Sequence, residues 1–260
     1  MKIGIIGDIH EDIVDLKKAL ILIEKTGCDE IICTGDIIGF GYPNFGFFDT
    51  RNASGCIQAV SSHCTHTVAG NHDMSSIGRI PEFTAGFQYP DDWYRMAYRK
   101  KKKLAEDHVW LPEENEFDPL IGPDEVRFLH SLPEYKLLEY DDLRILFSHY
   151  FFPDLSGSSK RHYLAFEELP SHFRFMKKNK CTLGISGHVH PEGMLFATEN
   201  KWDYMGFGET SFEIVPIWIS IPCIANGAKE NGFAILDTDR LTIEAIPLGT
   251  PKRIMTTVCV

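Results

Sequence analysis

Five short segments of this chain share one pattern, in which an apolar run ends in a small residue followed by aspartate, asparagine or histidine. The segments are Gly7-Asp8-Ile9-His10, Gly35-Asp36, Gly70-Asn71-His72-Asp73, Ser148-His149 and Gly187-His188-Val189-His190. Short apolar runs are typical of buried strands, and α/β sheets place their ligands beyond the carboxyl ends of such strands. A glycine before the polar residue also lets the backbone turn sharply. The pattern therefore predicts that these side chains meet at one edge of an α/β fold.

The segments between these strand ends predict helices. Apolar residues recur at helical spacing at Ile13, Leu16, Leu20 and Ile23. Gly27 is placed to end that helix, and further helices are expected over 56–62 and 162–178. Strands that alternate with helices are typical of a parallel sheet with crossover connections. Two strands near Asp141 predict a tight hairpin, and the chain after Pro191 reads as strands alone.

The chain contains no repeat or linker that would divide it, so we expect a single domain over 1–260. The alternation of strand and helix patterns stops between residues 74 and 130, where aromatic residues, charges and five prolines accumulate. We interpret 74–130 as a mainly helical cap insertion. Its run of cations at 99–103 is expected to lie on a helix.

The composition limits the partners of this chain. Its formal net charge is -11 and its pI is about 5.4, which disfavours nucleic acid as a partner. A phosphate substrate is still allowed, because bound cations reverse the local sign of the charge. No signal peptide follows Met1, and no apolar run reaches the roughly 20 residues of a membrane span. The seven cysteines form no CxxC pair. We therefore expect a cytoplasmic protein that does not use a membrane.

The polar residues of the five segments supply oxygen and imidazole nitrogen but no thiolate. Such donors suit the divalent ions of Mn, Fe, Co, Ni and Zn. Two ions about 3.5–4 Å apart need a bridging ligand, usually a carboxylate. Each segment alone is a weak signal, since a single histidine is more often packed or exposed than metal-bound. All five segments in this order are difficult to explain by chance.

D-x-H, G-D, G-N-H-D, a lone histidine and G-H-x-H, in this order, resemble the signature of the calcineurin-like metallophosphoesterase family. The resemblance runs from the first strand to His190. It implies two sets of metal ligands and one bridge: Asp8, His10 and His190 for one ion, Asn71, His149 and His188 for the other, and Asp36 between them. It also implies that His72 contacts the phosphate and helps to protonate the leaving oxygen. The implied fold is a four-layer α-β-β-α sandwich, which agrees with the strand-rich C-terminal third.

The activity that the resemblance implies is hydrolysis of phosphomonoesters or phosphodiesters. A metal-bridging hydroxide would attack phosphorus in line, since coordination lowers the pKa of bound water. The expected cofactors are therefore two divalent metal ions. The expected partner is a small phosphorylated substrate, with nucleotides among the candidates. No cysteine lies inside a motif, which argues against a cysteine-dependent phosphatase.

The run Gly35-Asp36-Ile37-Ile38-Gly39-Phe40-Gly41 resembles the prokaryotic branch of YfcE-like and diadenosine-tetraphosphatase-like proteins. The G-D-x-V-D-R-G run of the protein Ser/Thr phosphatases is absent. Two positions depart from the branch pattern. Tyr150 stands where S-H-G is common, and we expect it to narrow the site or to stack on a substrate ring. Asn226 and Gly227 stand where an N-P-G-S segment is common.

Three other features allow two interpretations each. Asp73 either orients a ligand or caps a turn, and the sequence weighs these equally. The cations at 99–103 form either a solvated helix face, which is favoured, or a device that selects a polyphosphate or nucleotide. Trp110 is expected to pack within the cap, and base stacking is the less favoured alternative.

Two rival functions belong to the same fold. A catalytically silent, metal-binding regulatory protein would be favoured by an incomplete ligand set, yet all seven ligands and His72 are present. A nuclease would need a basic groove, which the net charge of -11 disfavours. Hydrolysis of a small phosphoester is therefore the function that the sequence favours.

Overall fold

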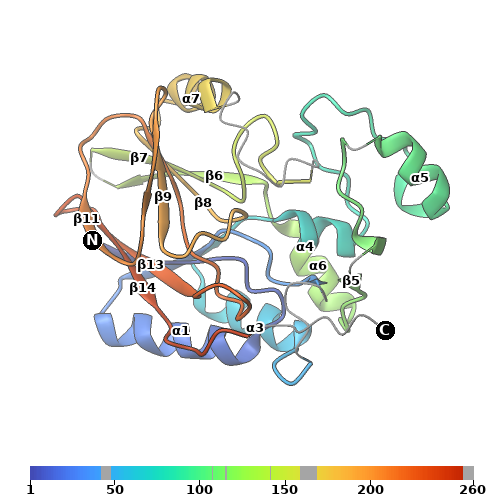
Figure 1. Cartoon of the computed structure of the whole chain (residues 1–260), viewed down its shortest axis with the longest axis horizontal. Helices are drawn as coiled ribbons and strands as arrows, with labels where there is room; N and C mark the ends of the chain where they lie inside the picture. The colour runs from blue at the N-terminus through green and yellow to red at the C-terminus, as the bar shows by residue number, and fades with distance from the viewer. Residues whose placement is uncertain (42–47, 107, 115, 141, 159–168, 254–260) are drawn as a thin grey trace.

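The computed structural model describes residues 1–41, 48–106, 108–114, 116–140, 142–158 and 169–253. Two six-stranded sheets pack face to face, and helices cover both outer faces, so the molecule has four layers (Figure 1). This arrangement confirms the predicted α-β-β-α sandwich. Within the described residues, no helix has the length and apolar character that crossing a membrane requires.

The first sheet joins strands from both ends of the chain. Its order is β11-β14-β13-β1-β2-β4, with bounds Gly208–Ser211, Thr242–Pro247, Gly232–Asp237, Lys2–Ile6, Glu30–Cys33 and His66–Thr67. β1, β2 and β4 run parallel, as the intervening helices predict. β13 and β14 extend the sheet in antiparallel pairs. Helices α1 (Ile13–Thr26) and α3 (Ala53–His63) cover its outer face (Figure 1).

The second sheet carries the remaining long strands. Its order is β10-β9-β12-β8-β7-β6, with bounds Trp202–Met205, Met194–Ala197, Ile217–Ser220, Leu183–Ser186, Leu143–Ser148 and Tyr135–Tyr140. β6 and β7 form the predicted hairpin, and β7, β8 and β12 run parallel. Helix α7 (Leu169–Lys178) covers the outer face. The part of the predicted helix before Leu169 lies outside the described residues.

Alternation along the strands builds the core between the sheets. Ile3 and Ile5 of β1 pack with Phe147 and Ile185 of the second sheet. Ile6 instead packs with the helices on the outer face. Because successive side chains of a strand point to opposite faces, a strand that is buried on both faces must be apolar throughout. This explains why the central strands were recognisable as continuous apolar runs.

The predicted first helix is capped at its start and ends where expected. The Asp12 carboxylate accepts a hydrogen bond from the backbone N–H of Asp15 at 3.1 Å, which caps the start of α1. Gly27 ends the helix in the left-handed conformation, at a φ of 68°. Glycine adopts this conformation without a Cβ penalty, so it is a common residue after the last turn of a helix.

The segment 74–130 is less helical than predicted. Two helices lie at its ends, α4 (Asn71–Ser76) and α6 (Pro123–Ser131). Between them, the described residues form the helix α5 (Tyr98–Ala105), two 3-10 turns (Trp93–Arg95 and Pro112–Glu114) and the short strand β5 (Glu116–Phe117). Prolines remove backbone donors and disfavour a helical residue before them, and the segment contains five.

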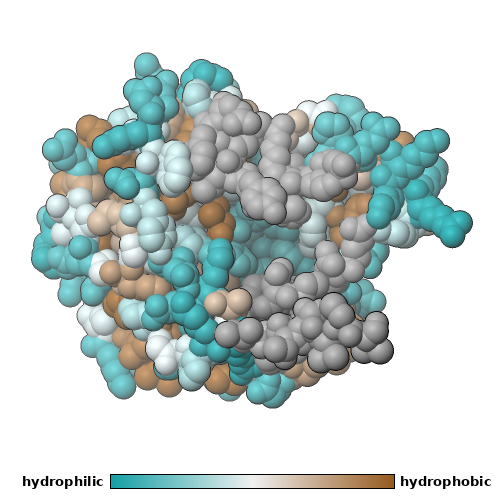
Figure 2. All heavy atoms as spheres, in the orientation of Figure 1, coloured by the Kyte–Doolittle hydropathy of each residue, from teal (hydrophilic) through white to brown (hydrophobic). Residues whose placement is uncertain are grey.

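The part of this segment between α4 and α6 forms a lobe that projects beside the sandwich, with α5 at its far end (Figure 1). Trp93, Ala105, Val109 and Leu111 form a small apolar cluster of its own. Hydrophilic side chains gather over the end of the lobe (Figure 2). β5 attaches the lobe to the sandwich side, because it pairs antiparallel with β3 (Phe40–Gly41).

Candidate metal centre

The strand ends bring the predicted ligands together. The residues follow β1 (Asp8, His10), β2 (Asp36), β7 (His149) and β8 (His188, His190), and Asn71 begins α4. Three overlapping groups of side chains have ligand-type atoms within 4.8 Å of one another: Asp8, His10 and His190; His10, Asp36 and His72; Asp36, His149 and His188. Six of the seven predicted ligands belong to these groups, and Asn71 lies next in the chain to His72, a member of the second group.

The first group matches one predicted ion site. Nε2 of His190 lies 2.9 Å from Oδ1 of Asp8, and 3.4 Å from Nε2 of His10. The backbone N–H of His188 donates to both carboxylate oxygens of Asp8, at 2.9 and 3.0 Å. These bonds fix the carboxylate of Asp8 across the ends of two strands that belong to different sheets.

The third group, which contains Asp36, His149 and His188, corresponds to the other predicted ion site. Nε2 of His149 is 3.0 Å from Oδ2 of Asp36 and 3.9 Å from Oδ1 of Asp8. Nδ1 of His188 is 3.2 Å from Nε2 of His149. Asp36 belongs to one group with His10 and to another with His149 and His188, so it lies near ligands of both predicted ions, as a bridging carboxylate must.

Burial and opposite charges together shift the pKa values at this centre. Burial works to raise the pKa of Asp36, but the imidazoles of His149 and His72 outweigh it and hold the pKa well below its usual range. Burial likewise works to lower the pKa of His149, but Asp36 and Asp8 raise it to about 9. For His10, burial and the neighbouring His72 lower the pKa to about 3. The carboxylate of Asp36 is therefore ionised at neutral pH, as a ligand of a cation must be.

Backbone carbonyls orient two of the predicted histidine ligands. Nδ1 of His10 lies 2.9 Å from the carbonyl of Gly39, and Nδ1 of His149 lies 2.9 Å from the carbonyl of Thr34. A histidine that donates one ring N–H to a carbonyl presents its other nitrogen to the metal in a fixed direction. Both contacts aim Nε2 at the groups described above.

Asn71 tests whether these residues fit a cation. Its side chain is 1% exposed, and neither amide atom has a hydrogen-bond partner among the described residues. Leaving a buried polar atom unpaired costs about 1–3 kcal/mol, so such atoms usually have a partner. A divalent ion beside the amide oxygen would provide one. Together with the oxygen and nitrogen donors around Asp36, this fits the binding of a divalent cation.

Close approach between motifs explains the glycines before the ligands. A Cβ on Gly70 would lie 2.1 Å from Oδ1 of Asp36, and a Cβ on Gly187 would lie 2.3 Å from Oδ2 of Asp8. The backbone also turns sharply at several of the predicted ligands themselves. A left-handed φ between 45° and 65° occurs at Asp8, His10, Asp36, His188 and His190. Such angles are uncommon outside glycine and occur at functional sites, where the surroundings hold them in place.

Asp73 holds backbone rather than a histidine ring. One carboxylate oxygen accepts hydrogen bonds from the N–H groups of Ile37 (2.9 Å) and Ile38 (3.2 Å), and the other accepts from Gly70 at 3.0 Å. Of the two interpretations of Asp73, the structure therefore favours the capping one. The bonds also fasten the start of α4 to the loop after Asp36.

His72 lies beside the centre with part of its surface accessible. Its backbone N–H donates to Asp36 at 2.9 Å, and its Nε2 is 3.8 Å from the other oxygen of that carboxylate. Its ring packs against His10 and Trp110, with centroids 4.7 and 4.4 Å apart. Its Nδ1 contacts the carboxylate of Glu116. Burial works to lower the pKa of His72, but Glu116 and Asp36 raise it to about 9.

No sequence pattern marks Glu116, which reaches His72 because β5 pairs with β3. Both strands contain two residues, too few for a recognisable pattern. Trp110 was expected to pack within the cap. Its contact with His72 instead places it beside the centre.

Of the two expectations for Tyr150, stacking on a substrate ring is wrong. The side chain is 1% exposed and belongs to the core beneath α7, so it cannot stack on a substrate. Its ring lies 4.5 Å from that of His188 and 4.0 Å from that of Phe151. Tyr150 is therefore a packing residue that supports a predicted ligand from below.

The turn at Asn226 supports the first motif. The backbone N–H of Asn226 donates to the Asp12 carboxylate at 3.1 Å, and the N–H of Ala225 donates to the carbonyl of Asp8 at 3.0 Å. Both bonds hold the sharp turn that contains Asp8 and His10. The segment thus braces the predicted ligands without the proline and serine of the branch pattern.

The cations at 99–103 lie on α5 as predicted. Lys101 is buried and pairs with Glu113, whereas the other four side chains are exposed. The helix lies at the far end of the lobe (Figure 1). This arrangement favours the interpretation of a solvated helix face.

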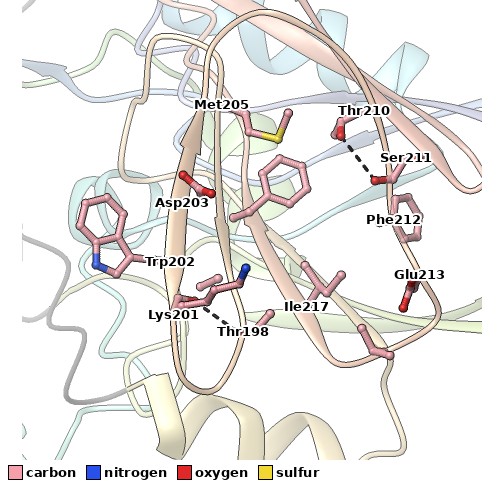
Figure 3. A pocket seen from close by; sticks show the side chains of 13 residues that line it. Thr198, Lys201, Trp202, Asp203, Met205, Thr210, Ser211, Phe212, Glu213 and Ile217 are labelled. Carbon is pink, nitrogen blue, oxygen red and sulfur yellow. Dashed lines mark hydrogen bonds between the residues drawn. The ribbon is translucent and has the colours of Figure 1, made fainter.

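A separate groove of about 300 Å³ opens along β10, near the loop before β12. Figure 3 shows Trp202, Asp203 and Met205 beside it on one wall, with Thr210 and Phe212 on the other. None of the predicted ligands lines this groove. It is therefore not part of the candidate metal centre.

Comparisons with known proteins agree with this geometry. A sequence profile described as "Calcineurin-like phosphoesterase" matches residues 1–192. A protein of Methanocaldococcus jannaschii is 25% identical over 162 residues, which are 58% of this chain and 54% of that protein. The chain thus spans about half the length of this relative.

Two solved structures are similar over nearly the whole chain. A metallophosphoesterase from Sphaerobacter thermophilus has a TM-score of 0.63 and 18% identity, and covers 95% of this chain and 87% of its own. A hypothetical protein from Pyrococcus horikoshii has a TM-score of 0.57 and 12% identity, with the same coverage of 95% and 87%. These similarities show a shared fold.

Proposed function

The chain belongs to the calcineurin-like phosphoesterase family, and on this premise we propose that it hydrolyses small phosphomonoesters or phosphodiesters with two divalent cations. The proposed ligands are Asp8, His10 and His190 for one cation, Asn71, His149 and His188 for the other, and Asp36 for both. The position of Asp36 supports this most directly, because its carboxylate groups with His10 on one side and with His149 and His188 on the other. Two cations about 3.5–4 Å apart need such a shared carboxylate.

Two bound cations would supply a nucleophilic hydroxide near neutral pH and neutralise charge on the phosphoryl oxygens. The chain itself supplies the proton for the leaving oxygen. His72 is 17% exposed and lies beside Asp36, so it faces the place where the ester would bind. General acid catalysis of this kind contributes about 10²–10⁴-fold.

A covalent route through a cysteine has no support in the described residues around the centre. Cys223 lies close to Asp8, but its thiol donates to the carbonyl of that residue at 3.0 Å. The side chain is 6% exposed, and burial, as the largest influence, raises the pKa of its thiol. A reactive cysteine needs the opposite shift, toward the thiolate.

The test is to load the purified protein with Mn, Ni, Zn or Mg and to assay aryl monoesters, aryl diesters and dinucleotides. We expect Asp36→Asn to lower turnover by at least about 10²-fold, because the variant loses the shared charge between the cations. Elemental analysis should show less bound metal per chain in Asp36→Asn than in the wild type. Asp203→Asn, on the exposed strand β10, is the matched control and should retain activity. Metal-loaded wild-type protein that turns over nothing on the panel would refute the proposal.

A further inference from the structure

The strand β5 carries a carboxylate from the projecting lobe into the metal centre. The side chain of Glu116 is 8% exposed, and its Oε1 contacts Nδ1 of His72. Carboxylates are rarely buried unless they are paired. The pairing partner here is the residue that would donate a proton, so the contact bears on the reaction itself.

Several contacts fix this strand against the loops of the centre. β5 pairs with β3 in a register that sets Glu116 opposite Gly41 and Phe117 opposite Phe40. Arg51 donates from one guanidinium nitrogen to the carbonyl of Asp118 at 2.7 Å, and from another to the Glu11 carboxylate at 2.5 Å.

Glu11 is 1% exposed and follows His10 directly in the chain. Arg51 therefore ties the lobe to the first motif. Its guanidinium also lies over the rings of Phe40 and Phe117, at 5.0 and 5.9 Å from their centroids. A strand that is held on both sides positions its side chain more firmly than a loose loop would.

Contacts on three sides of His72 leave its ring one orientation. Glu116 contacts Nδ1, Trp110 packs against the ring, and His10 meets it edge to face. With Nδ1 turned to Glu116, Nε2 points toward Asp36 at 3.8 Å. A carboxylate on one nitrogen of a histidine fixes both the ring direction and the nitrogen that faces the reaction.

We propose that Glu116 is a positioning residue, which holds His72 so that Nε2 faces the leaving oxygen of the ester. The inference rests on the proposed phosphoester hydrolysis and extends it. The lobe, on this proposal, completes the proton-donating part of the centre. Glu116 itself touches neither the phosphate nor the cations.

The experiment compares two esters that differ only in the leaving group. A 4-nitrophenolate departs without a proton, whereas an alkoxide needs one, so only the alkyl ester depends on His72. We expect Glu116→Gln to lower kcat on the alkyl ester by roughly 10- to 100-fold, the usual range for a supporting contact. On the 4-nitrophenyl ester, kcat of the variant should differ from that of the wild type by less than about 3-fold. For each ester, the KM of the variant should stay close to the wild-type KM.

Two further variants separate positioning from structural support. Glu113→Gln removes another carboxylate of the lobe, one that pairs with Lys101, and should leave both rates unchanged. In a His72→Asn background, adding Glu116→Gln should lower the alkyl-ester rate no further, because the two residues act as a unit. Glu116→Asp keeps the carboxylate and should recover part of the lost rate.

The outcomes divide clearly. A loss confined to the alkyl ester and absent in the His72→Asn background supports the proposal. An equal loss on both esters, a full additional loss in that background, or no loss at all would overturn it. Wild-type protein that is inactive on both esters would instead refute the proposed function.

Discussion

Replacing the buried His172 by glutamine should make the stability of this protein less sensitive to acid. His172 lies on α7 and is fully buried. Its Nδ1 accepts a hydrogen bond from the backbone N–H of Phe152 at 2.9 Å, and its Nε2 has no hydrogen-bond partner among the described residues. Burial lowers its pKa from 6.5 to about 3, so the folded protein holds the ring neutral.

The sign of the effect follows from proton binding. Between pH 6.5 and pH 3 the unfolded chain binds a proton at this histidine and the folded chain does not. The stability contributed by the neutral ring is therefore fully present above pH 6.5 and is lost as the pH falls toward 3. Linkage gives a loss of about 2 kcal/mol between pH 7 and pH 5, and about 5 kcal/mol in total.

The assay is urea unfolding of the metal-free wild type and the His172→Gln variant at a series of pH values. Glutamine can still accept the hydrogen bond from Phe152, and its packing cost is the same at every pH. Carboxylates and histidines of the metal centre titrate in both proteins and cancel in the difference. The variant should lose about 2 kcal/mol less than the wild type between pH 7 and pH 5. Parallel pH profiles would refute the reasoning, and the exposed His130→Gln is the control that should reproduce the wild-type profile.

Three further outcomes follow from the described contacts. Gly70→Ala should weaken metal binding by at least about 10-fold in calorimetric titration, because its Cβ would displace the carboxylate of Asp36. Gly206 has open space around it, so Gly206→Ala should bind metal like the wild type. Equal metal affinities of Gly70→Ala and the wild type would contradict this prediction. Chelation of bound metal should lower the thermal midpoint in scanning calorimetry, because a cation at 100 times its Kd adds about 2.7 kcal/mol to the free energy of unfolding. A midpoint that does not recover when Mn is returned would count against this prediction. Tyr150→Ala should cost about 3–5 kcal/mol in urea unfolding, because the ring packs in the core and against His188. A shift in substrate preference at unchanged stability would contradict this.

Local patterns predicted most of the fold and most of the side chains that gather at the strand ends. The apolar runs of the central strands are visible because these strands are buried on both faces, and Gly27 ends α1 where a left-handed residue is needed. The assignment of individual ligands to the two ions stays a prediction.

The features that the sequence missed depend on contacts between distant segments. β10 and β11 are exposed edge strands without an apolar run, so nothing marks them. Glu116 reaches the centre through a pairing of two-residue strands. Tyr150 follows a ligand directly, and whether its side chain faces substrate or core is decided by α7, which packs from far along the chain.

The left-handed backbone at five of the seven predicted ligands implies a trade-off between activity and thermal stability. A residue other than glycine costs about 1–2 kcal/mol in that conformation, and the surrounding hydrogen bonds hold it there. At positions 8, 10, 36, 188 and 190, glycine would remove this strain and asparagine would reduce it. A library of variants selected for thermal tolerance alone should therefore accumulate these two residues at the five positions and lose hydrolysis before it loses the fold. Survivors that keep all five residues while gaining stability only elsewhere would show that the strain weighs little in the native state.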